Sequence, residues 1–556
     1  MESIPDGDLK YVKHYRPNDL YWGLGIENET YFTTNSPIEK TGSYIKKNRR
    51  RDRYSVDYNT NYDQDKLIKY LNKMFLDNDS YKIPQYINAH TFIKTDTKGE
   101  HQTLYTIERT PNPKFNGKTL QELMMQTDNI LSTDFDNKYL FDGDTIEFIT
   151  QDFYKTTVDK CVNELVSYKQ NFLLTINEFM KSNNLPILNY PKINFGLVQF
   201  RSNNSNVSIF NNGTYHVNIT IPTVLDSNAK IADPILFEKQ HKNAIKILKW
   251  MEPLIISIYG SPDVYSFDDD GRYSAGSLRL TASRYIGIGT YNTSTMKKGK
   301  MLQDAKTTSH IYQNSNSWYN QLYKLTDYRQ GDHIGYDVNY AKHYNAGIEF
   351  RILDYFPEDA LPDLINFIIL LFDHSLENEI TKSAYDCQEW HNFTTNVLLN
   401  GYVGKIPYRL ITSYHKILGF PLINEPNIKY YLGTLIDFLH AKYHNSYCSK
   451  CMSPNMTKPL FHNINKYMWE NNYLQYLPIN NKNHIRVLKL YDIYKNMKDP
   501  TNSFVINNNN RLHNLLISTE LHNHNNLNLE EFYAELLKLS NQKFDIQKYV
   551  LLKKCG

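Results

Sequence analysis

The sequence predicts an α+β protein with a mostly antiparallel sheet and a mainly helical C-terminal region. Short β-forming runs and longer helical runs are mixed through the first two thirds of the chain, and several of the short runs are polar on one face only. After about Lys382 the strand signal fades, and Asn-rich stretches separate helical segments. We therefore expect one domain over residues 1–381 and a helical region over residues 382–556, whose role the sequence leaves open.

The individual elements follow from the period of the apolar residues. Strand candidates show alternation or β-branched content, and they are residues 21–32, 145–150, 192–201, 214–222, 276–282 and 346–353. Helical candidates of the first domain are residues 64–76, 120–130, 157–181, 234–258 and 359–377. Those of the C-terminal region are residues 390–397, 429–443, 484–497 and 527–539.

The composition indicates which partners and which cellular compartment to expect. Sixty-two basic and 59 acidic side chains leave a formal charge of +3, so no global charge indicates nucleic acid or a membrane surface as partner. Five cysteines are too few for a disulfide framework and fit a reducing compartment. The longest apolar run, residues 364–372, contains Asn366 and is far shorter than the roughly 20 residues of a membrane span. The acidic N-terminus lacks the apolar core of a signal peptide, so we expect a cytoplasmic protein.

Two strand candidates carry charge where a buried strand is normally apolar. Residues two apart share a strand face, so Glu27 and Glu29 project together in GIENET (residues 25–30), as do Glu349 and Arg351 in GIEFRILDYFP (residues 347–357). Ionised groups on a half-buried sheet are costly unless they are paired or bind a metal. Paired carboxylates are suited to hold Mg²⁺ ions that bridge ATP phosphates, whereas the alternative is a solvated strand face.

Further acidic candidates lie between these strands. Glu147 stands inside the β-forming run TIEFIT, residues 145–150, where the alternative is an edge strand with one outward acid. Asp134 and Asp144 precede it, and the sequence does not say which of them would reach the same metal.

A histidine and two arginines complete the candidate site. His216 shares its strand face with Asn218, so it would line the same cavity as the acids if the strands are neighbours, although a lone histidine on a sheet is more often structural. Arg279 and Arg351 are candidate anion-binding residues, because a guanidinium group binds phosphate and carboxylate oxygens in a bidentate manner. A surface ion pair is the alternative for each arginine.

Other chemistries fit the sequence less well. Residues 117–119 match the end of a phosphate-binding P-loop, but Asn112 stands where its first glycine is required. The strings HExxH and GxSxG, which mark zinc proteases and serine hydrolases, do not occur. The basic run at residues 46–53 is interpreted as a solvated loop, with an anion-steering rim or a localisation signal as alternatives.

A zinc site is a separate hypothesis for the C-terminal region. Cys448 and Cys451 form a CxxC pair, with His444 before it and His462 after it. These residue types are zinc ligands, but their spacing is irregular.

Several segments, taken in order, resemble the glutamate–cysteine ligases, particularly the bacterial type, within the glutamine-synthetase-like carboxylate–amine ligases. The resemblance covers roughly residues 20–375, and the late string IEFRILDYFP is its most specific part. The other matching strings are GIENET, IEFIT, TYHVNITIP, IYGSPDV and GSLRL. The resemblance implies a glutamine-synthetase-like, curved and mostly antiparallel sheet flanked by helices.

The resemblance also implies how the metal ligands are shared. It assigns Glu27, His216 and Glu349 to one Mg²⁺ ion, and Glu29 and Glu147 to another with help from an aspartate. Two or three Mg²⁺ ions, or Mn²⁺ ions in their place, would accompany ATP.

For the arginines, the resemblance implies contacts with the reacting groups. Arg351 would meet the transferred phosphoryl group, and Arg279 the substrate or the acyl phosphate. The expected activity is an ATP-dependent ligation of a carboxylate, with glutamate as the implied donor, to an amine. Cysteine as the amine would give γ-glutamylcysteine, the precursor of glutathione. The expected partners are small molecules, and the oligomeric state is left open.

The chain departs from the family pattern where substrate choice is made. After Ser277-Leu278-Arg279 the family continues with an Asp and a Leu-Gly-Tyr, whereas this chain has Leu280 to Tyr285, LTASRY. Asp134 also lies farther before Glu147 than the family's acid does. The acceptor amine therefore stays open, and the competing hypotheses are a ligase for another amine, a guanidino kinase on a related scaffold, and a pseudoenzyme that binds nucleotide or a partner protein.

Overall fold

The computed structural model of the chain describes the regions that position the candidate site. The described residues are 16, 19–30, 33–34, 93–94, 118–119, 124–142, 145–154, 156–182, 187–190, 194–200, 207–260, 276–281, 291–292, 297–298, 337–340, 347–401 and 404–460. The predicted helices at 64–76, 484–497 and 527–539 and the basic run at 46–53 lie outside the described residues.

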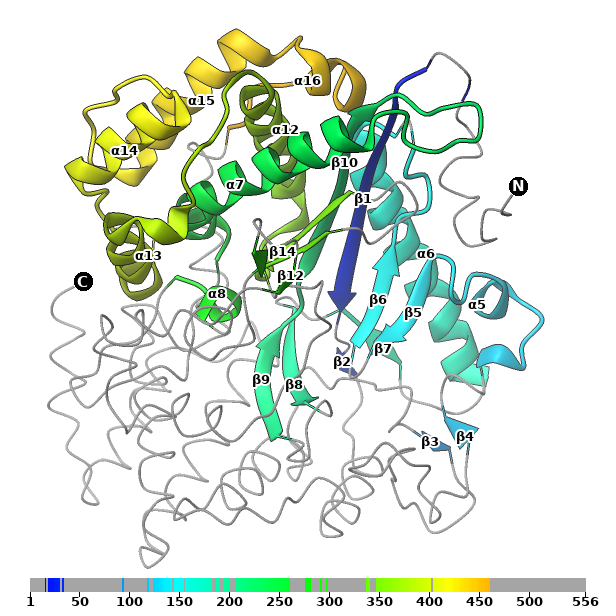
Figure 1. Cartoon of the computed structure of the whole chain (residues 1–556). Helices are drawn as coiled ribbons and strands as arrows, with labels where there is room; N and C mark the ends of the chain where they lie inside the picture. The colour runs from blue at the N-terminus through cyan, green and yellow to red at the C-terminus, as the bar shows by residue number, and fades with distance from the viewer. Residues whose placement is uncertain are drawn as a thin grey trace, which may run out of the picture.

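A six-stranded antiparallel sheet forms the centre of the described structure (Figure 1). Its order is β13-β14-β10-β1-β6-β5, and every neighbouring pair is antiparallel. The strands are β1 (Tyr21–Thr30), β5 (Tyr139–Asp142), β6 (Thr145–Ile149), β10 (Tyr215–Thr223), β13 (Val338–Tyr340) and β14 (Ile348–Leu353). The predicted α+β class with an antiparallel sheet is therefore confirmed.

Smaller strand pairs and the helices complete the described structure. The pairs are β2 (Thr33–Thr34) with β7 (Leu188–Asn189), β3 (Ile93–Lys94) with β4 (Lys118–Thr119), β8 (Phe195–Phe200) with β9 (Val207–Asn212), and β11 (Tyr291–Asn292) with β12 (Lys297–Lys298). The helices are α5 (Ile130–Thr133), α6 (Val158–Ser182), α7 (Pro234–Tyr259), α8 (Leu278–Thr281), α12 (Leu361–Glu377), α13 (Gln388–Asn400), α14 (Tyr408–Leu418), α15 (Ile428–Tyr443) and α16 (Tyr447–Met452), with short 3-10 turns η3 (Glu358–Ala360) and η4 (Ala384–Asp386).

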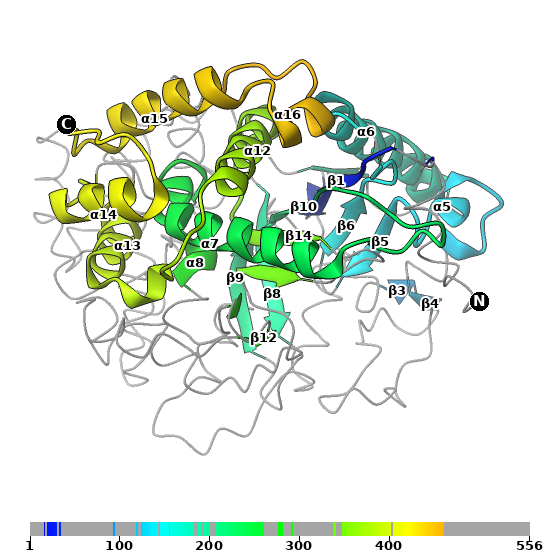
Figure 2. The ribbon, with the colours of Figure 1, turned by 45° about the horizontal axis from the view of Figure 1, so that its top comes forward.

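Helices cover one face of the sheet and leave the other face to polar side chains. Figure 2 shows α6, α12, α15 and α16 on one side of the strands, and α6 and α16 both contact β1. The strand residues on the helix side are buried and mostly apolar, among them Leu24, Ile26, Phe148, Val217 and Phe350. Side chains alternate along a strand, so the residues next to these in sequence point to the opposite face of the sheet. They include the charged residues predicted to form the site.

Helix α12 contains the longest apolar run of the chain. Residues 364–372 are buried on every side of this helix, including Asn366, whose Oδ1 accepts a hydrogen bond of 2.8 Å from Ser453 Oγ. A helix that is apolar all round belongs in a protein interior, and α12 packs against α6, α7, α15 and α16. None of the helices within the described residues combines the length and the apolar character needed to cross a bilayer.

One buried ion pair connects the helices to the edge of the sheet. Lys249 Nζ of α7 lies 2.5 Å from Asp337 Oδ2, directly before β13, and 2.7 Å from Tyr385 Oη of η4. The Asp337 carbonyl in turn accepts a hydrogen bond of 2.9 Å from the backbone N–H of Arg351. The pair therefore fixes the edge strand next to a candidate site residue.

A buried histidine holds β10 against α7. The N–H of Ile221 donates to His241 Nε2 at 3.1 Å, so Nδ1 carries the ring proton and donates to the Phe237 carbonyl at 2.8 Å. Burial lowers the pKa of His241 to about 4, and the neutral ring is the form that fits this position.

Most predicted elements are present, and two of the predictions are wrong. The predicted strand at 276–282 is instead the short helix α8, because side chains satisfy its first amides: Ser277 Oγ accepts from Leu280 N, and Asp354 accepts from Arg279 N, both at 2.9 Å. The predicted helix at 120–130 is interrupted by a turn at residues 126–129, where Asn129 caps α5.

Candidate metal centre

The register of the central strands brings the predicted acids and the histidine together. Glu27 of β1 lies opposite His216 of β10, and Glu29 lies opposite Glu147 of β6. On the other side of β10, Glu349 of β14 lies opposite both Asn218 and Asn339. Residues opposite each other on one sheet face are in contact distance, so four strands contribute to one polar cluster.

His216 stands at the middle of this cluster. Its Nδ1 lies 3.1 Å from Glu27 Oε2 and 3.2 Å from Glu349 Oε1. Its Nε2 lies 3.0 Å from Arg279 Nη2 and 3.4 Å from Thr214 Oγ1. His216 is 3% exposed, so the ring has a defined and largely dry environment with carboxylates on one side and a guanidinium group on the other.

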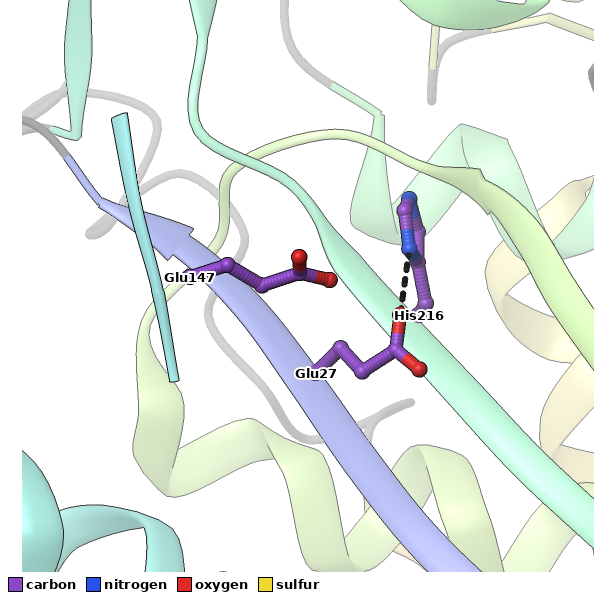
Figure 3. Close-up of side chains that lie close together, drawn as sticks. All are labelled: Glu27, Glu147 and His216. Atoms are coloured by element: carbon purple, nitrogen blue, oxygen red, sulfur yellow. Dashed lines mark hydrogen bonds and ion pairs between the residues drawn. The ribbon is translucent and has the colours of Figure 1, made fainter. Parts of the chain in front are cut away.

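Glu147 completes a group with the composition of a metal site. Potential ligand atoms of Glu27, Glu147 and His216 all lie within 4.8 Å of one another, and Figure 3 shows their side chains converging. Carboxylate oxygens suit Mg²⁺ and Mn²⁺, and an added imidazole is a common ligand of Mn²⁺ and other transition metals. The group therefore fits a divalent cation.

Neighbouring amides hold the carboxylates in place. Asn218 Nδ2 donates to Glu27 Oε1 at 3.2 Å, and Asn339 Nδ2 donates to Glu349 Oε2 at 2.8 Å. Glu349 also accepts a hydrogen bond of 2.7 Å from Arg351 Nη1 and is fully buried. Such supporting hydrogen bonds orient metal ligands before a metal binds.

Arg279 reaches the cluster from α8. Its Nε donates to the Arg351 carbonyl, its backbone N–H donates to Asp354, and the residue is 6% exposed. Asp354 also accepts a hydrogen bond of 2.5 Å from Ser277 Oγ, so one carboxylate at the end of β14 organises the start of the helix. The anchoring fixes the position of the guanidinium group beside His216.

The balance of charge in the cluster favours a cation. The carboxylates of Glu27 and Glu147 have oxygens within 4.8 Å of each other, and two unit charges at that separation repel by roughly 3.5 kcal/mol at an effective dielectric constant of about 20. Four carboxylates and two guanidinium groups make up the described part of the centre, so, His216 aside, the formal negative charges exceed the positive ones by two. The members are Glu27, Glu29, Glu147, Glu349, Arg279 and Arg351. A divalent cation would offset this excess.

The structure brings together all seven predicted site residues. Within the described residues, the additional candidate ligands do not join them in the metal group. Asp134 is not part of the metal group and forms an ion pair of 2.9 Å with Lys138 at the end of α5. Asp144 and His462 lie outside the described residues. Within the described residues, Cys448 and Cys451 belong to no cluster of three potential metal ligands.

Three residues that hold the site residues in place were not among those predicted from the sequence. Asn339 lies on β13, which is only three residues long, although its alternation with Val338 and Tyr340 is a weak strand signal. Thr214 donates to Glu29 Oε2 at 3.1 Å, and Asp354 organises α8. Thr214 and Asp354 act on partners that are 185 and 75 positions away, which no local pattern reveals.

The chain corresponds along nearly its whole length to a viral protein. It is 59% identical over 554 residues to the uncharacterized protein R704 of Acanthamoeba polyphaga mimivirus, a match that covers 99% of this chain and 98% of that protein. No known protein-family profile matches the chain.

Proposed function

We propose that this chain, which belongs to the family of the mimivirus protein R704, is an ATP- and Mg²⁺-dependent carboxylate–amine ligase. The proposal includes a glutamine-synthetase-like scaffold, in which a curved antiparallel sheet carries the reaction on its polar face. The six-stranded sheet with helices on the opposite face is consistent with that scaffold. Similarity to the glutamate–cysteine ligases in the order of the sequence motifs supports the activity.

The register of β6, β1, β10 and β14 is the observation that carries the proposal. It brings Glu147, Glu27, His216 and Glu349 onto one face of four neighbouring strands, in a staggered row, although these residues are far apart in sequence. Burying the carboxylates of Glu27 and Glu349 side by side is costly for stability. A binding function for cations and for the phosphate groups they accompany accounts for that cost.

The proposed reaction needs charge neutralisation more than acid–base chemistry. A carboxylate does not condense with an amine directly, because oxide is a poor leaving group. In the proposed reaction the donor carboxylate attacks the γ-phosphoryl group of ATP, ADP leaves, and the amine then displaces phosphate from the acyl phosphate. Bound Mg²⁺ ions would supply the main neutralisation of the phosphate oxygens.

The residues of the chain have distinct tasks in this scheme. Glu27, Glu147, Glu349 and His216 would hold the metal ions, and Glu29 would share the ion next to Glu147. Arg351 and Arg279 would orient anionic oxygens of the phosphoryl group and the substrate. The proposed donor is glutamate, and cysteine is one of the candidate amines.

A second candidate within the same scaffold is a guanidino kinase or a ligase for another amine. The changed segment after Arg279 favours a different amine, because it replaces the family pattern next to the proposed substrate. A pseudoenzyme that binds nucleotide would keep the ligands and lack turnover.

Measuring ADP release separates these possibilities. The purified protein is supplied with ATP, Mg²⁺, glutamate and a panel of amines that includes cysteine, and the product is identified by mass spectrometry. Amine-stimulated ADP release that is lost in Glu349→Ala and Arg351→Ala supports the ligase. Glu379→Gln is the matched control, because its side chain is 70% exposed on the surface. Metal-dependent ATP binding without amine-stimulated turnover would overturn the proposal.

A further inference from the structure

A lysine on the helix side of the sheet contacts the strand that carries two of the proposed ligands. Asn28 lies between Glu27 and Glu29 on β1, so its side chain points to the opposite face, where α6 packs. There its Oδ1 accepts a hydrogen bond of 2.9 Å from Lys169 Nζ of α6. The same ammonium group forms an ion pair with Glu358, the first residue of η3. The lysine therefore joins β1 to the segment that follows β14.

The hydrogen bonds of Asn28 fix the direction of its amide. Oδ1 accepts from Lys169 and, at 2.8 Å, from Thr30 Oγ1. Nδ2 donates to the Thr214 carbonyl at 3.0 Å and to the Glu29 carbonyl at 3.4 Å. A reversed amide would turn its NH₂ group toward the ammonium group and its oxygen toward two carbonyls. The contact with Lys169 therefore keeps Nδ2 on Thr214, in a position that is fully buried.

Thr214 connects this amide to the metal centre on the other face. Its carbonyl accepts a second hydrogen bond, from the backbone N–H of Glu29 at 3.1 Å. Its Oγ1 donates to Glu29 Oε2, also at 3.1 Å. Hydrogen-bond partners of a ligand orient it before the metal binds. A series of hydrogen bonds thus runs from Lys169 through Asn28 and Thr214 to the carboxylate of a proposed ligand.

The apolar packing of α6 does not depend on Lys169. Leu165, Phe172 and Ile176 of this helix are buried, whereas the side chain of Lys169 is 12% exposed. Burial lowers the pKa of Lys169 to about 7, and the ion pair with Glu358 favours the charged form. A substitution that removes only the charge should therefore leave the helix in place, and its effect is best measured below pH 7.

We propose that Lys169 is a positioning residue of the metal centre. Through Asn28 and Thr214 it holds the carboxylate of Glu29 in the geometry in which it meets a divalent cation. Because Glu358 follows β14, the strand of Glu349, the same ammonium group also fixes β1 relative to the opposite side of the centre. This inference rests on the proposed function, since it assumes that the centre binds a divalent cation.

Calorimetric titration with Mg²⁺ at pH 6 tests this role. Lys169→Met keeps the length of the side chain and removes its charge. We expect it to bind Mg²⁺ about tenfold more weakly than the wild type, as the loss of an outer hydrogen-bond partner does. Loss of a positive charge alone would favour a cation, so weaker binding reports the geometry. Lys160→Met, at an exposed position of the same helix, is the matched control and should bind as the wild type.

A conservative variant separates charge from packing. Lys169→Arg keeps the positive charge and the donors, so its Mg²⁺ affinity should stay within about threefold of the wild type. An affinity as low as that of Lys169→Met would show that packing matters and would overturn the proposal. Mg²⁺ affinity of Lys169→Met within about twofold of the wild type would overturn it as well.

A double variant shows whether the effect passes through Asn28. Asn28→Leu alone should weaken Mg²⁺ binding about as much as Lys169→Met. The double variant should bind within about threefold of Asn28→Leu, because residues that act in one hydrogen-bond network are not additive. Multiplied effects, with binding about one hundredfold weaker in the double variant, would contradict a path through Asn28.

Thermal melting identifies the variants that fold. If Lys169→Met does not fold, Glu358→Gln takes its place, because this side chain is 26% exposed and its loss releases the ammonium group from η3. We expect Mg²⁺ binding weaker by about threefold or more, and unchanged affinity overturns the inference. In all these outcomes the wild type binds Mg²⁺ and the proposed function stands. A wild type that does not bind Mg²⁺ overturns the proposed function together with the inference.

Discussion

Replacing Glu147 by glutamine should stabilise the metal-free protein and weaken its response to Mg²⁺. Glu147 lies opposite Glu29, and one of its oxygens is within 4.8 Å of a ligand atom of Glu27. Glutamine keeps the shape of the side chain and removes its charge. The substitution should therefore relieve repulsion in the absence of a cation and remove a proposed ligand in its presence.

The size of the effect follows from the geometry. Repulsion between the two carboxylates is roughly 3.5 kcal/mol at an effective dielectric constant of about 20, and the partial exposure of Glu147 screens it to about 1–2 kcal/mol. With an unfolding entropy of about 2.1 cal/mol/K per residue, this corresponds to a rise of about 1–2 °C in Tm for the whole chain. Mg²⁺ at one hundred times its Kd adds about 2.7 kcal/mol to the wild type, or about 2 °C.

Scanning calorimetry in EDTA and in Mg²⁺ checks this prediction. The Glu147→Gln variant should melt above the wild type in EDTA and below it in saturating Mg²⁺, so the order of the two proteins reverses. Glu379→Gln, on the exposed surface, should match the wild type in both buffers. A variant that melts below the wild type in EDTA, or that keeps the full gain from Mg²⁺, would refute the reasoning.

Three further substitutions test the supporting structure. Lys249→Met should lower the free energy of unfolding by about 3–5 kcal/mol in chemical denaturation, because it removes the cation 2.5 Å from buried Asp337. Asn339→Leu should weaken Mg²⁺ binding about tenfold in calorimetry, because Glu349 loses an orienting hydrogen bond. The folded pKa of His241, about 4, lies below the unfolded value of 6.5, so the unfolded chain binds more protons between them. Stability should fall by about 3 kcal/mol from pH 6.5 to pH 4, and His241→Gln should flatten this slope.

Exposed residues of the same types provide the controls. Lys239→Met, with a side chain 67% exposed, should leave the free energy of unfolding nearly unchanged. Asn392→Leu should keep wild-type Mg²⁺ affinity, and His444→Gln should keep the acid slope, since both residues are exposed. A loss below 1 kcal/mol for Lys249→Met, unchanged Mg²⁺ binding for Asn339→Leu, or an unaltered slope for His241→Gln would contradict the respective prediction.

Local patterns predicted the helices and strands well where the spacing of apolar residues was regular or continued over many residues. Helices α6 and α7 begin and end within one residue of the predicted segments, because their apolar residues follow the helical period over more than twenty residues. The alternation in β1, β10 and β14 predicted both the strands and the face on which Glu27, His216 and Glu349 lie.

Contacts between residues far apart in sequence could not be predicted from local patterns. The pairing of Glu27 with His216 joins residues separated by 189 positions, and the period of a strand does not specify its neighbours. Similarly, Asp354 caps α8 from 75 positions away, so the segment around Arg279 has strand-like composition and a helical structure. The resemblance to a known family, rather than periodicity, supplied the expectation that these strands meet.

Transfer of oxygen from the donor carboxylate to phosphate tests the central claim most directly. Glutamate labelled with oxygen-18 in its γ-carboxylate is incubated with the protein, ATP, Mg²⁺ and the amine panel, and the released phosphate is analysed by mass spectrometry. Activation as an acyl phosphate predicts one labelled oxygen in the phosphate for each amide formed. Amide formation or ADP release with unlabelled phosphate would contradict the account.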